Sequence, residues 1–244
     1  MQPRTTCTKA PEAQLVTAAA ACIVSLANKA VATHGSCSIA LSGGNSPRKL
    51  YRHLSRLAMP AEDVMPWQQT ELYWGDERCV PPEALESNYR MAKEELIDRI
   101  AIPESNIHPM PHVTGNVMQA AEQYSKELQN AFRDRMRKQL PVFDIIILGL
   151  GPDGHTASLF PGDPGALNEK SSWVTAATAP EAMPPRHRLT LTLPVINNAD
   201  AIIFYVPGQE KTLLAEEIMH GRKPRVPAGM VAPSKGTLHW FIGS

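Results

Sequence analysis

One apolar segment constrains the fold of this chain more than any other. Residues 143–150 read FDIIILGL, an almost continuous run of apolar side chains followed by a loop rich in glycine. A strand that is apolar throughout is buried on both faces, as in the centre of a parallel sheet covered by helices. We therefore predict a central parallel strand over 143–150.

Helix and strand patterns alternate along the rest of the chain. Apolar residues recur at helical spacing from Leu15 to Ala30, before a helix-breaking Gly35. Residues 188–193 (RLTLTL) alternate in polarity, which predicts a half-exposed or edge strand. Further helices are expected at 47–58, 88–100, 120–138 and 209–219, and further strands at 37–41, 71–75, 201–206 and 237–242. This order predicts an α/β fold with a doubly wound, mainly parallel sheet flanked by helices, and a ligand site beyond the carboxyl ends of the strands.

The composition is typical of a globular protein. The chain has 244 residues, of which 43% are apolar and 20% charged, and its formal net charge is zero. The length fits one large α/β domain, and the charge predicts neither a nucleic-acid nor a membrane partner. Residues 13–27 are apolar, but no basic cluster precedes them, so we interpret them as a core helix rather than a signal sequence. Four scattered cysteines without a CxxC pair indicate reduced thiols in a cytoplasmic protein.

The first candidate site is a turn between a predicted strand and a predicted helix. Residues 42–46, here called the glycine loop, read SGGNS. Gly43 and Gly44 allow the backbone to approach a ligand closely, so that free amides point at an anion. Ser42, Asn45 and Ser46 can add hydrogen bonds. The loop is neither a Walker A nor a dinucleotide-binding motif, and an ordinary glycine-rich turn is the alternative.

The second candidate site follows the next strand, where residues 74–78 read WGDER. Consecutive charged residues after a strand rarely belong to a core. The functional interpretation is that carboxylates such as Asp76 hold the guanidinium of Arg78, which is aimed into the cleft. Arginine suits planar oxyanions because its fork is bidentate. A solvated turn is the alternative.

The third candidate site follows the strongest predicted strand. Residues 149–156, here called the histidine loop, read GLGPDGHT. Glycines, Gly154 among them, shape a tight loop that delivers His155 to the end of the strand. A neutral imidazole is a suitable general base near pH 7. Asp153 could orient the ring or contact substrate hydroxyls.

Two basic positions complete the set. Arg188 opens the RLTLTL strand and Lys211 opens the helix after 201–206, and each is a candidate counter-charge for a phosphate, although either alone is more often a surface residue. Metal signals are weak, because prolines separate His108 from His112 and no helix can place both on one face. We expect no metal and no cofactor. A nucleophilic Ser158 would lack a separate base.

Together these blocks resemble the glucosamine-6-phosphate isomerase/6-phosphogluconolactonase family. LSGGNSP (41–47) is similar to the family's LSGGSTP loop, and WGDER followed by ESNY (86–89) is similar to its second block. Residues 143–162 (FDIIILGLGPDGHTASLFPG) resemble its signature, and 188–211 its C-terminal block. The resemblance implies a Rossmann-like fold shared with glucosamine-6-phosphate deaminase and ribose-5-phosphate isomerase. Residues 1–12 have no match and are expected to be flexible, which leaves 13–244 as a single catalytic domain.

The resemblance also assigns roles to residues. It implies His155 as general base, Asp153 as its polar neighbour and Arg78 as a substrate-facing arginine. It places the phosphate end at Gly43, Gly44, Ser46, Arg188 and Lys211. Asn45-Ser46 replaces a commoner Ser-Thr, and Gln209-Glu210 a commoner Gly-Glu, but both pairs keep hydrogen-bonding capacity.

The implied activity is hydrolysis of 6-phospho-D-glucono-1,5-lactone to 6-phosphogluconate, the second step of the oxidative pentose phosphate pathway. The expected partner is this small sugar phosphate lactone, and the expected state is a monomer, with a weak dimer as the alternative. An amino-sugar-phosphate deaminase or isomerase is the rival activity. A sugar-phosphate-sensing module without catalysis is the rival class, although it would not need His155.

Overall fold

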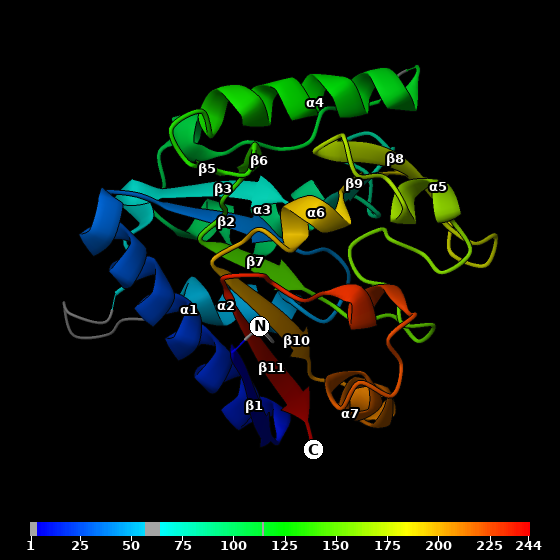
Figure 1. The fold of residues 1–244 in the computed structure, drawn as a ribbon. Coiled ribbons are helices and arrows are strands. Elements are labelled where there is room, and N and C mark those ends of the chain that lie inside the picture. Colours follow the sequence, from blue (N-terminus) through cyan, green and yellow to red (C-terminus); the bar gives the residue numbers. More distant parts are fainter. Residues whose placement is uncertain (1–3, 57–63, 114) are drawn as a thin grey trace.

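A six-stranded sheet forms the centre of the molecule (Figure 1). The computed structural model describes residues 4–56, 64–113 and 115–244. Every neighbouring pair in this sheet is parallel. In spatial order the strands are β1 (Arg4–Ala10), β11 (Thr237–Gly243), β10 (Ala201–Val206), β7 (Ile145–Leu148), β2 (Cys37–Leu41) and β3 (Thr70–Trp74). The predicted parallel α/β fold is therefore confirmed.

Strand β7 occupies the central position that its composition predicts. It pairs with β10 through Ile145 and Ala201, and with β2 through Ile145 and Ile39. All four of its side chains are at most 1% exposed. The regular strand is shorter than the predicted 143–150, because residues 149 and 150 already belong to the histidine loop.

Helix α1 (Glu12–His34) packs along β1, β11, β2 and β7 and beside α2 (Arg48–Leu54). Among the described residues it is the one helix long and apolar enough to cross a membrane, judged by length and composition. Seven of its side chains are nevertheless buried in the protein core: Leu15, Ala19, Ala20, Ile23, Val24, Ala27 and Ala30. It ends at Gly35, whose φ of +89° is the left-handed conformation that favours glycine. The predicted end of α2 near Ala58 lies outside the described residues.

Of the remaining helices, α3, α4 and α7 are shorter than predicted, and the short α5 and α6 were not predicted. They are α3 (Asn88–Glu95), α4 (Val117–Ala131), α5 (Pro164–Leu167), α6 (Leu193–Ile196) and α7 (Thr212–Met219). The 3-10 helices are η1 (Trp67–Gln69), η2 (Ile97–Arg99), η3 (Glu104–Asn106), η4 (Gln209–Lys211) and η5 (Pro227–Met230). Helices α4 and α1 lie on opposite sides of the molecule (Figure 1).

A second, antiparallel sheet was not predicted. It contains β4 (Asp76–Arg78), β9 (His187–Leu191) and β8 (Val174–Thr178), and α4 packs against it. A two-stranded ribbon, β5 (Met136–Arg137) with β6 (Leu140–Pro141), is separate. The prediction of a half-exposed or edge strand at RLTLTL is wrong, because β9 is the central strand of its sheet and is largely buried. The two threonines of the RLTLTL segment are buried. The Thr190 hydroxyl donates to Leu191 O, and the Thr192 hydroxyl donates to Ser172 O.

The N-terminal segment also differs from its prediction. Arg4–Ala10 pairs with Thr237–Gly243 over seven residue pairs, so this part of the predicted flexible segment is the edge strand β1. Hydrogen bonding to β11 extends a sheet that is already formed, and a local sequence pattern cannot reveal that partner. Because the main sheet draws strands from both ends of the chain, we propose that β1 belongs to the same single domain as residues 13–244.

Candidate active site

A pocket lies where several parallel strands end. It has a volume of about 260 Å³. Its walls are formed by the glycine loop after β2, part of β4, the histidine loop after β7, and η4. The predicted site residues that line it are Ser42, Gly43, Gly44, Asn45, Ser46, Asp76, Arg78, His155 and Lys211. This strand-end pocket occupies the position where doubly wound sheets bind ligands.

A buried tyrosine holds the start of the glycine loop. The Tyr51 hydroxyl on α2 donates to Ser42 O and accepts from Ser42 N, both at 2.8 Å. Ser42 N is therefore already used and is not available to a ligand. Gly44 has a φ of +84°, which turns the chain in a conformation that few other residues adopt. The loop is thus pre-shaped before any ligand arrives.

Asn88, the first residue of α3, packs against the same loop. Its Nδ2 donates to Asp76 O at 2.8 Å. A Cβ atom on Gly43 would lie 1.8 Å from Asn88 Oδ1, so only glycine fits at position 43. Asn88 is 1% exposed, and Oδ1 has no hydrogen-bond partner among the described residues. The sequence showed this residue within the ESNY block but gave no reason to assign it a position against the loop.

The Glu77 carboxylate organises the junction behind the pocket. It accepts hydrogen bonds from the backbone amides of Arg78, Asn88 and Tyr89, each at 2.7 Å, and from the Ser87 hydroxyl at 3.2 Å. Burial raises its pKa above the ordinary 4.5, although the three backbone bonds act in the opposite direction. Through these bonds Glu77 connects β4 to the first turn of α3. From the sequence alone, Glu77 was only one of three consecutive charged residues.

Two arginines face each other across the second sheet. Arg78 on β4 is directly paired with Arg188 on β9. Arg78 lines the pocket, and its Nη1 donates to Glu86 O at 2.5 Å. Among the described residues, Arg78 Nε and Arg188 Nε and Nη1 are buried without hydrogen-bond partners. Unpaired donors on two adjacent cations favour an anion at this junction.

The predicted direct role of Arg188 at the phosphate does not match its position. Arg188 is 5% exposed and does not line the pocket, and its Nη2 donates to Met183 O at 3.1 Å. Burial, and then the charge of Arg78, lower its pKa to about 10, so the side chain is still a cation at neutral pH. Arg188 therefore lies behind the pocket lining, to which it is connected by its hydrogen bond to the Met183 carbonyl.

His155 is held by Asp153. Its Nδ1 lies 2.5 Å from Asp153 Oδ1, which also accepts the His155 backbone amide at 3.0 Å. This bond occupies Nδ1 and leaves Nε2 as the ring nitrogen available for proton transfer. Phe160 packs on the ring with centroids 4.7 Å apart, and a Cβ atom on Gly151 would collide with the ring at 2.1 Å. Asp153 therefore orients the base from outside the pocket lining.

Gly154 has a conformational role and does not line the pocket. Its φ is +82°, and an added Cβ would lie 2.7 Å from the Val226 side chain. Ser158 is 1% exposed and donates to Asp76 Oδ2 at 2.6 Å, so its hydroxyl supports Asp76 instead of facing a ligand. Sequence reasoning did not assign several lining residues: Gly149, Leu150, Gly151, Pro152, Thr156, Ala157 and Met183. Met183 carries no sequence signal, because the loop before β9 matches no motif.

Cations outnumber carboxylates in the strand-end pocket. Arg78 and Lys211 line it with Asp76, and Lys211 makes no ion pair with any residue that the structure describes. Within the described ranges, no group of three or more histidine, cysteine, aspartate or glutamate side chains could hold a metal ion. The site is thus a small cavity with more cations than carboxylates and with a histidine in its lining, at the strand ends of a parallel α/β protein.

Comparison with known sequences identifies the family. Residues 10–240 match the family described as Glucosamine-6-phosphate isomerases/6-phosphogluconolactonase, and the chain belongs to this family. It is similar to the 6-phosphogluconolactonase of Synechocystis sp., with 40% identity over 93% of this chain and 90% of the relative. The human 6-phosphogluconolactonase is 38% identical over 94% of this chain and 84% of its own length.

Solved structures give the same result for the fold. The 6-phosphogluconolactonase from Thermotoga maritima superposes with a TM-score of 0.83 at 29% identity, covering 99% of this chain and 100% of that one. The enzyme of that name from Trypanosoma cruzi also gives a TM-score of 0.83, at 30% identity and with 99% and 94% coverage. The overall fold is therefore shared over almost the whole chain.

Proposed function

We propose that this protein hydrolyses 6-phospho-D-glucono-1,5-lactone to 6-phosphogluconate, the second step of the oxidative pentose phosphate pathway. The observation that carries the proposal is the strand-end pocket. It combines a histidine whose Nδ1 is engaged by Asp153 with Lys211 and the glycine loop. Membership of the family supports the same activity, because both sequence relatives and both solved structures described above bear the name 6-phosphogluconolactonase.

The phosphate binds at the cationic side of the pocket. Lys211 and the amides of the glycine loop neutralise its charge, with Gly43 and Gly44 allowing close approach. Ser46 and Asn45 line the same wall and contribute hydrogen bonds. Arg188 adds positive potential from behind the pocket lining without direct contact. Recognition of the phosphate fixes the lactone ring relative to His155, which lowers the entropic part of the barrier.

His155 acts as general base and then as general acid. Its Nε2 removes a proton from water while the water oxygen attacks C1 of the lactone, which forms a tetrahedral oxyanion. Arg78 or the backbone amides of the histidine loop stabilise this oxyanion. The protonated ring then gives its proton to the ring oxygen as the C1–O bond breaks. Asp153 keeps Nδ1 protonated and stabilises the imidazolium between the two steps.

The structure also bears on the rival deaminase or isomerase. That chemistry needs a carboxylate beside the histidine in addition to Asp153. In the loop after His155, the first carboxylate is that of Asp163. Asp163 accepts the amides of Ala166 at 3.3 Å and Thr178 at 2.7 Å, so its carboxylate supports α5 and β8. This structural role of Asp163 favours lactone hydrolysis over amine release.

The state and location of the enzyme are part of the proposal. All four cysteines, Cys7, Cys22, Cys37 and Cys79, are free thiols. Reduced thiols suit a cytoplasmic enzyme. We propose that the enzyme is a monomer.

The direct test is a lactonase assay with freshly generated 6-phosphogluconolactone, corrected for spontaneous ring opening. We expect fast hydrolysis of the phosphorylated lactone, slowed by about two to four orders of magnitude in His155→Ala, with unphosphorylated gluconolactone a poor substrate. Glucosamine 6-phosphate should release no ammonia under the same conditions. Ammonia release at a rate comparable to lactone opening, and lost in His155→Ala, would replace this proposal with the deaminase.

A further inference from the structure

A second and larger cavity lies at the opposite end of the main sheet. Its volume is about 480 Å³. Its walls include the first residues of β1, β10 and β11, at Arg4, Ala201 and Thr237, together with the last turns of α1. This amino-end cavity is separate from the strand-end pocket and shares no lining residue with it. The volume falls within the usual range for small-molecule sites, about 300–1,000 Å³.

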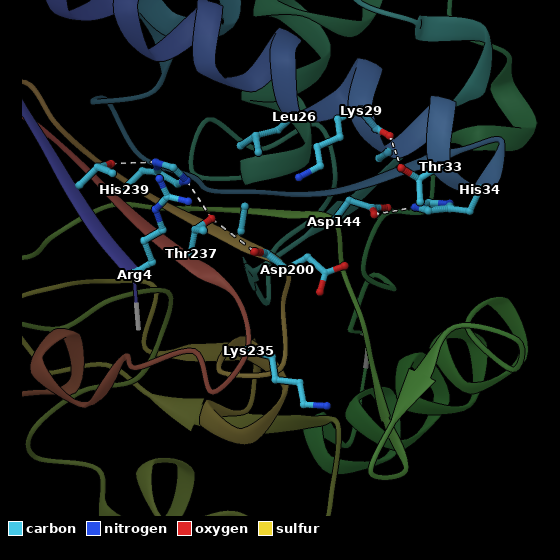
Figure 2. A pocket seen from close by; sticks show the side chains of 13 residues that line it. Arg4, Leu26, Lys29, Thr33, His34, Asp144, Asp200, Lys235, Thr237 and His239 are labelled. Carbon is cyan, nitrogen blue, oxygen red and sulfur yellow. Dashed lines mark hydrogen bonds and ion pairs between the residues drawn. The ribbon is translucent and has the colours of Figure 1, made fainter. Parts of the chain in front are cut away.

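Three cations from three different parts of the chain line this cavity. Arg4 belongs to β1, Lys29 to α1, and Lys235 to the turn before β11. In the part of the chain that the structure describes, none of the three forms an ion pair. Figure 2 shows the Arg4 and Lys29 side chains extending toward the same space, with His239 beside Arg4. Like charges that converge without a carboxylate partner favour an anion between them.

The carboxylates of the cavity do not neutralise these cations. Asp144 is engaged by His34 at 2.9 Å and by Arg135 at 2.8 Å. Asp200 is engaged by Arg137 at 2.5 Å, and also by Arg135 at 3.5 Å. Neither arginine lines the cavity. Arginines outside the cavity therefore compensate both carboxylates, and His34 of the lining also contacts Asp144. The three cations have no carboxylate partner among the described residues.

Hydroxyl groups are already oriented beside Arg4. The two ring nitrogens of His239 lie 2.8 Å from Thr6 Oγ1 and 2.8 Å from Thr237 Oγ1. Burial, and then the charge of Arg4, lower the pKa of His239, so the ring stays neutral at pH 7. A neutral ring donates to one threonine and accepts from the other. The Thr237 hydroxyl also donates to Asp200 O at 3.4 Å, so Thr6 is the threonine whose hydroxyl proton is left for a ligand when it accepts from the ring.

We propose that the amino-end cavity is a binding site for a small hydroxylated phosphate monoester. Arg4 and Lys29 contact the phosphate. A guanidinium and an ammonium carry two positive charges, which match the two negative charges of a phosphate monoester better than the one charge of a carboxylate ligand. The Thr6 hydroxyl and the half-exposed Asp200 carboxylate bind the hydroxyl groups of the ligand. The site does not depend on the proposed lactonase activity, since it contains none of the residues assigned to that chemistry.

Binding can be tested with D-glucose 6-phosphate as the probe in the Lys211→Met background, where the strand-end pocket is weakened. Titration by NMR follows the amide resonances of Thr6, Thr237 and His239. We expect saturable shifts of these resonances, and affinity about tenfold to hundredfold weaker when Arg4→Gln and Lys29→Gln are added. Lys126→Gln, which removes an exposed lysine from α4, is the matched control and should bind as its parent does.

Two further arms separate the possible outcomes. Unphosphorylated D-glucose should produce no shifts at millimolar concentration, and inorganic phosphate should produce weaker shifts of the same resonances. Shifts confined to Gly43, Gly44 and His155 would overturn the proposal, as would equal affinity with and without Arg4 and Lys29. Circular dichroism and the melting temperature establish that the double variant is folded, so that loss of binding reports on the two charges.

Discussion

The two ends of the same parallel sheet differ in how their charged groups are held. At the carboxyl end, hydrogen bonds and packing fix the pocket: buried Tyr51 holds the glycine loop, buried Asn88 packs against Gly43, and the more exposed Asp153 orients His155. At the amino end, Arg4 and Lys29 are exposed side chains that converge from separate elements. Catalysis needs groups that do not reorganise during the reaction, whereas binding tolerates flexible cations. The difference explains why acid–base chemistry is placed at the smaller of the two cavities.

Removing the base tests this contrast most strongly. His155→Ala should lower kcat by about two to four orders of magnitude, the usual contribution of a general base, while the fold persists. Steady-state lactone hydrolysis measures kcat, and circular dichroism checks the fold. At the amino end, Arg4→Gln should leave kcat unchanged. A folded His155→Ala variant with near-normal kcat would mean that another group activates water.

Removing the free cation of the strand-end pocket comes next. Lys211→Met should raise KM by about one to two decades, because a hydrogen bond between charged groups contributes roughly 1.5–3 kcal/mol. The change in kcat should be smaller, since the lysine contacts the phosphate and not the reacting carbon. Lys29→Met, at the amino end, is the matched control and should leave KM unaltered. A fall in kcat at constant KM would instead place Lys211 in the chemical step.

Overfilling the glycine loop should have a smaller effect. Gly43→Ala puts a Cβ atom 1.8 Å from Asn88 Oδ1, so we expect a loss of about 1–3 kcal/mol in the free energy of unfolding and a raised KM. Asn88→Ala removes the atoms that collide, so the double variant should be more stable than the sum of the two single effects. Gly162→Ala, with no atom within 4 Å of its added Cβ, is the control. Strict additivity in chemical denaturation would show that Asn88 does not pack on the loop.

The smallest effect should come from Glu77→Gln. The amide keeps one acceptor oxygen and loses part of the hydrogen-bond set, so unfolding at pH 7 should become easier by on the order of 1 kcal/mol. Exposed Glu122→Gln is the control. Because burial raises the folded-state pKa of Glu77 above 4.5, its contribution to stability is fully present below that pH and declines as pH rises through the raised value. The stability difference between wild type and Glu77→Gln should therefore shrink from acid toward neutral pH, and a difference that grows would contradict the direction of this shift.

Local patterns were sufficient for five of the six strands of the main sheet, all but β1, and for most of the strand-end pocket. The apolar run around Ile145–Leu148 specified a buried strand, since both of its faces had to be covered. Glycine-rich sequences after β2 and β7 predicted loops at the carboxyl end of the main sheet. Parallel strands bring those ends to one edge of the sheet, so the glycine loop and His155 could be placed together without coordinates.

Long-range packing was needed for everything that depends on a distant partner. RLTLTL alternates as an edge strand would, yet β4 and β8 bury it on both sides, and Arg188 is buried with it. Residues 4–10 carry no apolar pattern, yet β11 recruits them into the sheet. Asn88 and Glu77 acquired their positions from α3 packing on β4, and Met183 from the loop before β9. The periodicity of a segment indicates whether that segment forms a strand or a helix. The burial of its side chains and their hydrogen-bond partners depend on other segments that pack against it from elsewhere in the chain.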